Sequence, residues 1–319
     1  MRVLVTGAAG FIGSSIAQAE LARSHEVVGL DCFIDYYPRA IKERNLEPLR
    51  ADGRFRFIEA SLVGVNLDEL LRDVQVVYHQ AAQAGVRASW GREFEIYTVN
   101  NIQGTQRLLE ACKGREIRVV YASSSSVYGN TEHLPMREDH PTAPISPYGV
   151  TKLAAEHLAR LYWINYQVHT VSLRYFTVYG PKQRPDMAFH KLIRAMLLGE
   201  EFKVFGDGDQ TRDFTFIADA VAANLAAAEQ GKPGAVYNIG GGARVTMNSV
   251  IKLLEKITGR PARLVNVETQ KGDVRHTYAD TSAARTDLGY APRVSLEEGL
   301  RAEVQWIQSV ILPLEKAGV

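Results

Sequence analysis

Tyr148 and Lys152 have the types and spacing of an acid–base pair, in the stretch Tyr148-Gly-Val-Thr-Lys152. On a helix, residues i and i+4 lie on one face, so this spacing places a phenol beside an ammonium group. A neighbouring positive charge favours the phenolate and lowers the phenol pKa from its usual value of about 10. The pair could therefore take and return a hydroxyl proton near neutral pH.

Glycines near the N-terminus have the spacing of a nucleotide-binding turn. The run Gly7-Ala-Ala-Gly10-Phe11-Ile12-Gly13 follows a strand-like segment and opens a predicted helix. Glycines in such a turn let the backbone approach a pyrophosphate, and the helix N-terminus faces the negative charge. The alternative is a purely structural strand-to-helix turn. The position of the run directly after a strand favours cofactor binding.

Asp31 indicates which dinucleotide this turn would bind. It closes the second predicted strand, 31 − 13 = 18 residues after Gly13. A carboxylate there can accept hydrogen bonds from the adenosine ribose hydroxyls and would repel a 2′-phosphate. The sequence therefore favours NAD over NADP.

The elements that must position these residues alternate between short β-branched runs and longer amphipathic stretches. Strands are predicted at residues 2–6, 26–31, 54–59, 75–80, 117–123 and 169–174, and helices at residues 13–23, 94–112 and 148–166. This alternation predicts an α/β fold with a doubly wound parallel sheet. The serine run 123–126 stands where one strand ends.

The regular alternation of predicted strands and helices ends beyond about Thr177. A helix at residues 189–198, a Gly-Asp-Gly turn at 206–208, and strands at 235–239 and 263–267 are predicted there. We therefore expect an NAD-binding domain over residues 1–177. A smaller mixed α/β substrate-binding domain over residues 178–319 should follow, with a soft boundary across which segments can interleave.

Composition excludes several classes of protein. The formal charge of 37 − 36 = +1 gives no electrostatic footprint for nucleic acid or an anionic membrane. Two cysteines, Cys32 and Cys112, are too few for a disulfide framework or a structural zinc site. The N-terminus lacks the long apolar core of a signal peptide, and no run has the length of a membrane span. We expect a cytoplasmic protein without a metal site.

Several segments together resemble the extended short-chain dehydrogenases/reductases, in the NAD-dependent sugar-nucleotide epimerase/dehydratase family. They are Thr6–Gly13, His79–Ala82, Asn101–Thr105, Ser123–Gly129, Tyr148–Lys152, Arg174–Pro181 and Arg212–Phe214. The resemblance implies a Rossmann-type domain with NAD as cofactor. It implies that Tyr148 is the acid/base, that Lys152 also binds the nicotinamide ribose, and that Ser124 bonds the reacting sugar hydroxyl.

The resemblance also implies further cofactor contacts. Ala81 and Ala82 match small residues over which NAD lies, and Tyr175 should lie near the nicotinamide. Asn101 matches an Asn near the cofactor, although a purely structural role is also open. Gln80 departs from the Leu that is usual in the family, a departure expected to alter contacts at that position without touching the chemistry.

The substrate implied by the resemblance is a nucleotide sugar. Arg212 stands at the family's diphosphate-binding Arg, Arg275 is a second candidate, and Val204 and Phe205 could border the base. Thr177 and the stretch Arg184-Pro-Asp-Met-Ala188 are similar to UDP-glucuronate 4-epimerases, as is Gly85–Gly91. A sugar carboxylate removed from water needs a charged or strongly donating partner. The candidates for that pocket are Arg184, Ser125, Ser126 and Thr177.

The sequence therefore predicts an enzyme that inverts carbon 4 of UDP-glucuronate through a 4-keto intermediate and gives UDP-galacturonate. Two enzyme alternatives stay open: a UDP-glucose/UDP-galactose 4-epimerase and a UDP-glucuronate decarboxylase. The serine run lacks the acidic residue expected of the decarboxylase. Outside enzymes, a non-catalytic NAD-binding protein is the alternative. A homodimer formed through the helices at 94–112 and 148–166 is expected.

Overall fold

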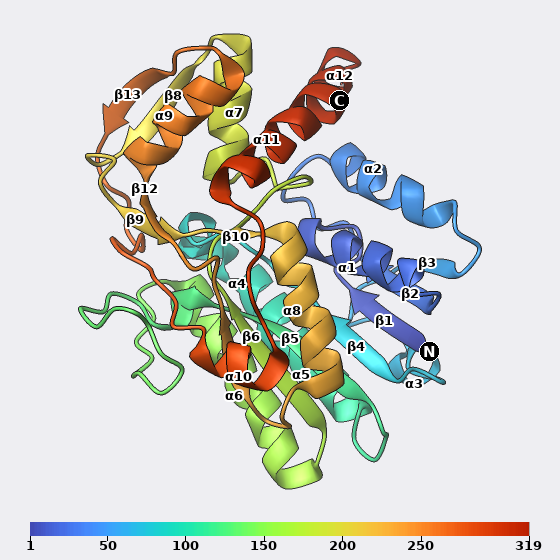
Figure 1. The fold of residues 1–319 in the computed structure, drawn as a ribbon. Helices are drawn as coiled ribbons and strands as arrows, with labels where there is room; N and C mark the ends of the chain where they lie inside the picture. The colour runs from blue at the N-terminus through green and yellow to red at the C-terminus, as the bar shows by residue number, and fades with distance from the viewer. Residues whose placement is uncertain (319) are drawn as a thin grey trace.

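A seven-stranded parallel sheet forms the centre of the computed structural model, which describes residues 1–318 (Figure 1). Its strand order is β11-β6-β5-β4-β1-β2-β3. The strands are β1 (Arg2–Thr6), β2 (Glu26–Asp31), β3 (Phe55–Glu59), β4 (Val76–His79), β5 (Arg118–Ser124), β6 (His169–Tyr175) and β11 (Val236–Ile239). The predicted α/β fold with a doubly wound parallel sheet is confirmed.

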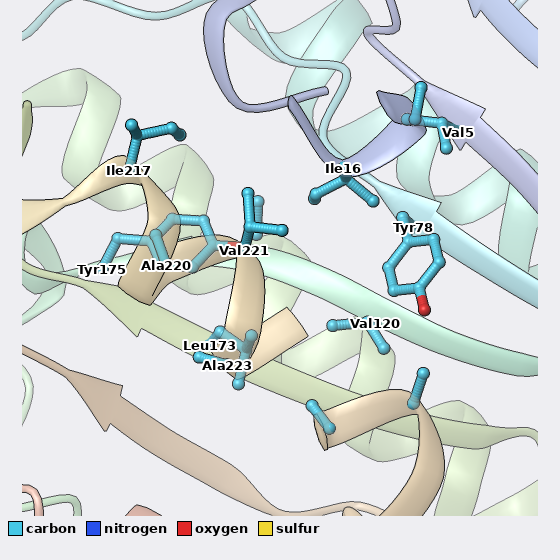
Figure 2. Close-up of a cluster of buried hydrophobic side chains, with 14 of the residues drawn as sticks. Val5, Ile16, Tyr78, Val120, Leu173, Tyr175, Ile217, Ala220, Val221 and Ala223 are labelled. Atoms are coloured by element: carbon cyan, nitrogen blue, oxygen red, sulfur yellow. The ribbon is translucent and has the colours of Figure 1, made fainter. Parts of the chain in front are cut away.

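Helices cover both faces of this sheet, because successive strand residues point to opposite sides. Val3 and Val5 of β1 enter one core and Leu4 enters the other. The first core also contains residues of α1 (Phe11–Ala22), α2 (Arg39–Arg50) and α8 (Ile217–Gln230). Figure 2 shows Ile16 and Val221 of this core beside the strand residues. The second core contains residues of α3 (Leu67–Leu70), α5 (Gly104–Ala111) and α6 (Pro147–Tyr166).

The strand order reverses between β1 and β4, which are neighbours in the sheet. Chain segments leave the carboxyl ends of these two strands toward opposite faces. The crevice at such a point is where doubly wound sheets bind ligands. The glycine turn, Asp31 and the serine run all begin at this edge, because each follows or ends a strand of the sheet.

A second group of elements lies above this edge in Figure 1 and has its own core. Its elements are β7 (Val178–Tyr179), α7 (Ala188–Leu198), β8 (Glu201–Phe205), β9 (Thr211–Asp213), β10 (Thr215–Phe216), β12 (Arg244–Thr246), α9 (Met247–Thr258), β13 (Arg263–Val267), α11 (Leu296–Trp306) and α12 (Leu312–Lys316). Strand β8 pairs with β13, β9 with β12 and β7 with β10. The short helix α10 (Ser282–Leu288) instead contributes Ala284 and Leu288 to the first core.

Besides α10, two elements beyond residue 177 return to the first sheet. Strand β11 pairs with β6, and α8 covers the same face as α1. Segments on either side of the expected boundary therefore interleave. The division of the chain into two domains at residue 177 stays a prediction.

Local structure differs from the prediction in several places, and two of them have a clear physical reason. The helix expected at 94–112 consists of α4 (Phe94–Tyr97), a π-helical segment (Thr98–Gln103) and α5. Such π-segments are not visible in hydrophobic periodicity. Helix α2 was not predicted, because Pro48 lies inside it and Pro disfavours helix interiors. Another π-segment, Ile307–Ile311, joins α11 to α12, and single 3₁₀ turns occur at Arg87–Ser89, Gly91–Glu93 and Ser125–Val127.

Among residues 1–318, each helix is too short or too polar to cross a bilayer.

Candidate active site

The glycine turn brings two strand ends into close contact. Gly7 has a φ of +69°, and a Cβ atom there would lie 2.9 Å from the backbone nitrogen of Ala81. A Cβ atom on Gly13 would lie 2.1 Å from the carbonyl oxygen of Gly7. Only glycine fits at these two positions, so the turn packs tightly against the segment that follows β4.

Helix α1 begins at this turn with its N-terminus open. Gly10 is the N-cap residue, and no side chain in the described chain caps it. The first backbone N–H groups of the helix are therefore free to bind an anion. Gly10, Phe11 and Ile12 line the cavity that the turn borders. These features fit the pyrophosphate of a dinucleotide.

Asp31 lines the same cavity, next to the glycine turn. Its Oδ2 accepts a hydrogen bond from the Ala9 N–H over 3.0 Å, and its Oδ1 accepts one from the Phe33 N–H over 2.8 Å. Burial raises the pKa of this carboxyl, and these backbone donors oppose the rise. Each carboxylate oxygen keeps a lone pair for a ribose hydroxyl. The arrangement fits NAD.

Tyr148 and Lys152 stand in the first turns of α6 and line the same cavity. The Ser146 Oγ caps the helix by accepting a hydrogen bond from the Gly149 N–H over 3.1 Å. The Tyr148 ring meets the Tyr97 ring edge to face, with centroids 6.3 Å apart. The Lys152 Nζ lies 4.6 Å from the centroid of the Tyr121 ring. The predicted pair therefore faces the cofactor cavity.

The electrostatics of this pair differ from the sequence expectation. Burial raises the pKa of Tyr148, while the Arg184 charge and the Ser124 hydroxyl lower it. Burial lowers the pKa of Lys152 to about 7, and the charge of Glu156, one turn further along α6, opposes this. The expected lowering of the Tyr148 pKa by Lys152 is not found: Arg184 and Ser124 supply the lowering, and burial outweighs it. Desolvation depends on tertiary packing, which spacing does not report.

Ser124 ends β5 beside Tyr148. Its Oγ accepts a hydrogen bond from the Ser126 N–H and donates one to the Ser126 Oγ, both over 3.1 Å. Ser123, Ser124, Ser125 and Ser126 all line a second cavity that also contains Tyr148. The serine run and the tyrosine thus meet, as the sequence predicts.

Asn101 lies behind the cofactor cavity. Its Nδ2 donates to the Gln83 carbonyl over 3.1 Å and to the Thr151 Oγ1 over 2.9 Å, and its Oδ1 accepts from the Gln83 N–H over 2.7 Å. It ties the segment after β4 to α6. Within the described chain it is not among the residues that line this cavity, so a direct cofactor contact stays a prediction.

Tyr175 is held by two amides. The Tyr175 hydroxyl donates a hydrogen bond to the Asn224 Oδ1 over 2.9 Å. The Gln80 Nε2 donates a hydrogen bond to this Asn224 Oδ1 over 3.1 Å. Gln80, Ala81, Ala82 and Tyr175 all line the cofactor cavity. Asn224 belongs to α8, and no sequence pattern predicts that it lies here. The unusual Gln80 thus has a partner far along the chain.

The second cavity continues into a third cavity, which lies among the second group of elements beyond residue 177. Both are lined by Thr177 and Phe205, and the third also contains Val204, Arg212 and Arg275. The Arg212 Nη1 donates to the carbonyls of Thr211 and Arg275 over 3.0 and 3.1 Å. The Arg275 side chain is 68% exposed and pairs with Asp207 over 3.2 Å. The predicted substrate residues therefore border one continuous cleft.

Two features of this cleft were missed by the sequence analysis. The Arg184 side chain forms a two-pronged ion pair with Asp186, which also accepts a hydrogen bond from Tyr36. Arg87 lies 3.9 Å from the centroid of the Phe205 ring and pairs with Asp273 over 2.6 Å. Asp186 and Arg87 both lie in stretches noted for their resemblance, which was the available signal.

The family model described as "NAD dependent epimerase/dehydratase family" matches residues 3–240. The chain belongs to this family. The predicted family and its NAD-dependent Rossmann-type fold are thereby confirmed. The site residues described above lie at the sheet edge of this epimerase/dehydratase family member.

Relatives in this family include proteins with named activities. A Bacillus cereus UDP-glucuronic acid 4-epimerase, solved with UDP-glucuronic acid and NAD, is 47% identical with a TM-score of 0.95, covering 97% of this chain and 100% of that one. A Thermodesulfobacterium geofontis UDP-glucuronate 4-epimerase is 37% identical over 95% of each chain. A Bacillus subtilis protein described as an uncharacterized UDP-glucose epimerase, YtcB, is 45% identical over 97% of this chain and 99% of that one.

Proposed function

We propose that this protein is an NAD-dependent UDP-sugar 4-epimerase that interconverts UDP-glucuronate and UDP-galacturonate. The observation that carries the proposal is the position of Tyr148. It lines both the cofactor cavity and the cleft that holds the serine run and Arg184. A sugar bound in the cleft would present its ring to the phenol at this junction. The B. cereus and T. geofontis relatives named above support the choice of substrate.

Each part of the site has a proposed role. Tyr148 is the acid/base, Ser124 bonds the reacting hydroxyl, and Lys152 binds the nicotinamide ribose. Further cofactor contacts are assigned to Gly7, Gly10, Phe11, Ile12, Gly13, Asp31, Ala81, Ala82, Asn101 and Tyr175. Substrate contacts are assigned to Ser125, Ser126, Thr177, Arg184, Val204, Phe205, Arg212 and Arg275.

The reaction follows from these roles. Tyr148 takes the proton of the 4-hydroxyl, and its phenol later returns a proton to the new hydroxyl. Bound NAD supplies a reversible acceptor for the hydride of carbon 4. The 4-keto sugar turns about its diphosphate linkage, which Arg212 holds, and presents its other face. The configuration at carbon 4 is then inverted with no net oxidation.

The carboxylate of UDP-glucuronate is assigned to the cleft of Arg184, Thr177 and the serine hydroxyls. A 4-keto glucuronate is a β-keto acid and loses carbon dioxide when its carboxylate bond aligns with the carbonyl π system. Donors that hold the carboxylate out of this alignment would protect the intermediate. The serine run contains no carboxyl side chain, which speaks against a decarboxylase.

One observation favours a second candidate, a UDP-glucose/UDP-galactose 4-epimerase. Asp186 already neutralises Arg184, so this guanidinium is not a free cation for a substrate carboxylate. The B. subtilis relative carries the name of a UDP-glucose epimerase. A neutral hexose would then occupy the same cleft.

Product analysis separates these functions. Purified protein is incubated with UDP-glucuronate and, separately, with UDP-glucose, and the sugars are identified by NMR. UDP-galacturonate supports the proposal. UDP-xylose indicates a decarboxylase, and turnover of UDP-glucose alone indicates the hexose epimerase. No turnover of either substrate by NAD-loaded protein contradicts the whole proposal.

We also propose that the protein acts in the cytoplasm as a homodimer. Helix α6 exposes Val150, Leu161 and Ile164 at 47%, 51% and 54%, and Ile96 of α4 is 38% exposed. The spacing of the three α6 residues places them on one side of the helix. An exposed apolar stripe of this kind is typical of an interface. Light scattering should give twice the chain mass for the natural protein and the single chain mass for Leu161→Glu; a monomeric natural protein would refute the dimer.

A further inference from the structure

Arg184 is held by a carboxylate two residues further along the chain. Its Nε donates to the Asp186 Oδ1 over 2.9 Å, and its Nη2 donates to the Asp186 Oδ2 over 3.0 Å. The two side chains are only 23% and 28% exposed. A two-pronged, charge-assisted contact fixes the plane of a guanidinium as well as its position.

Asp186 engages only one edge of this guanidinium. Arginine has five N–H donors, and Asp186 uses the one on Nε and one on Nη2. Within residues 1–318, Nη1 donates to no protein acceptor. Both residues line the cleft that contains Ser124 and Tyr148. The pair therefore leaves the Nη1 edge of Arg184 for a ligand.

Asp186 is itself held in place from a distant segment. The Tyr36 hydroxyl, from the segment after β2, donates to the Asp186 Oδ2 over 3.2 Å. Tyr36 packs on Gly85, where φ is +106° and a Cβ atom would lie 2.1 Å from the Tyr36 oxygen. Three chain segments that are far apart in the sequence thus fix the orientation of Arg184.

We propose that Asp186 is a positioning residue that aims the free edge of Arg184 at the carboxylate of the substrate. The inference rests on the proposed function, because it requires a carboxylated sugar. Asp186 also carries a negative charge that repels that carboxylate. Because the two-pronged contact is partly buried and reinforced by Tyr36, the gain from orientation outweighs this repulsion. Loss of Asp186 then weakens the binding only of ligands that carry a carboxylate.

The test compares two ligands that differ in the sugar acid. UDP-glucuronate and UDP are titrated by calorimetry into NAD-saturated protein, and the ratio of the two dissociation constants isolates the sugar contribution. We expect Asp186→Ala to reduce the preference for UDP-glucuronate about tenfold, the loss of one charge-assisted contact, and to leave UDP binding unchanged. Asp186→Asn should recover part of the preference, because its amide oxygen can still accept from Arg184.

The chain offers a matched control. Asp139 pairs with Arg137 at the same two-residue spacing, over 3.1 and 3.2 Å, and the two side chains are 69% and 58% exposed. Asp139→Ala should leave both dissociation constants unchanged. An equal change in the preference in this variant would overturn the inference.

Arg184→Ala distinguishes failure of the inference from failure of the proposed function. If Arg184→Ala leaves the preference for UDP-glucuronate intact, the carboxylate pocket itself is wrong. If Arg184→Ala removes the preference and Asp186→Ala leaves it unchanged or increases it, only the role of Asp186 is wrong. An equal loss of UDP binding in Asp186→Ala would show a general structural role and would also overturn the inference.

Discussion

Glu156 of α6 and Arg174 of β6 form a buried ion pair, with Arg174 Nε 3.0 Å from Oε2 and Nη2 2.6 Å from Oε1. The Ser123 hydroxyl donates to the same Oε2 over 2.6 Å. Glu156 thereby ties the helix that carries Tyr148 and Lys152 to the ends of two strands. Neither Glu156 nor Arg174 lines the cofactor cavity or the cleft, so the ion pair supports the helix of the proposed catalytic residues from outside the site.

Glu156→Gln should destabilise the fold strongly. The variant leaves the Arg174 guanidinium buried without a counter-charge, which typically costs about 3–5 kcal/mol. Urea unfolding measures the free energy. Glu297→Gln is the control, because its ion pair with Arg301 is largely exposed and contributes at most about 0.5 kcal/mol. Equal losses in the two variants would contradict the structural role of the buried pair.

Tyr148→Phe should abolish turnover while leaving the ligands bound. Loss of a positioned acid/base lowers kcat by about 10²- to 10⁴-fold. Tyr166→Phe is the matched control, because Tyr166 lies at the far end of the same helix and is 52% exposed. Steady-state kinetics and NAD titration make the comparison. Turnover of Tyr148→Phe close to that of Tyr166→Phe would refute the assignment.

His79 should make the fold sensitive to acid. Its Nδ1 accepts a hydrogen bond from the Thr6 hydroxyl over 2.8 Å, and its Nε2 donates to the Thr105 Oγ1 over 2.9 Å. These roles follow because Thr6 Oγ1 already accepts from the Ala81 N–H and the Thr105 hydroxyl donates to the Asn101 carbonyl. A second ring proton on Nδ1 would remove the acceptor of the Thr6 hydroxyl proton, and burial lowers the pKa of His79 to about 3.

The sign of the effect follows from this pKa. Below about pH 6.5, His79 binds a proton in the unfolded chain but stays neutral in the folded protein. The free energy of unfolding therefore decreases as the pH is lowered from about 6.5 to about 3. Between pH 6.5 and 4 the loss should be about 3 kcal/mol at this site, at about 1.4 kcal/mol per pH unit. His79→Gln keeps one donor and one acceptor but does not titrate. Urea unfolding at both pH values should show a smaller decrease in the free energy of unfolding for the variant than for the natural protein. Equal decreases would contradict the role of His79.

Gly85→Ala should disturb the contact between Tyr36 and Asp186. The new Cβ would overlap the Tyr36 oxygen, and the residue would also keep a positive φ. Gly91→Ala is the control, because its φ is +78° and no described atom lies within 4 Å of its added Cβ. Both variants lose about 1–2 kcal/mol from the left-handed backbone. The Gly85 variant should lose more unfolding free energy than the Gly91 variant, and it should also lose preference for UDP-glucuronate. Equal unfolding free energies of the two variants would refute the close contact.

The sequence by itself determined the features that depend on neighbours along the chain. The alternation of strands and helices, the glycine turn before α1 and the i, i+4 spacing of Tyr148 and Lys152 are all local patterns. Local patterns suffice because side-chain periodicity and turn geometry are set within a few residues. The end of a strand also places Asp31 and Ser124 at the sheet edge once the sheet is parallel. The assignment of individual residues to ligands stays a prediction.

Only the tertiary structure decided the pKa values of the site residues and the long-range contacts that hold them in place. Asn224 beside Tyr175, Tyr36 on Asp186, and Arg174 on Glu156 join residues from separate segments, which no spacing rule connects. The pKa values of Tyr148 and Lys152 likewise depend on burial by the whole fold. Desolvation and long-range hydrogen bonds are properties of the packed interior, so they appear only when the chain has folded.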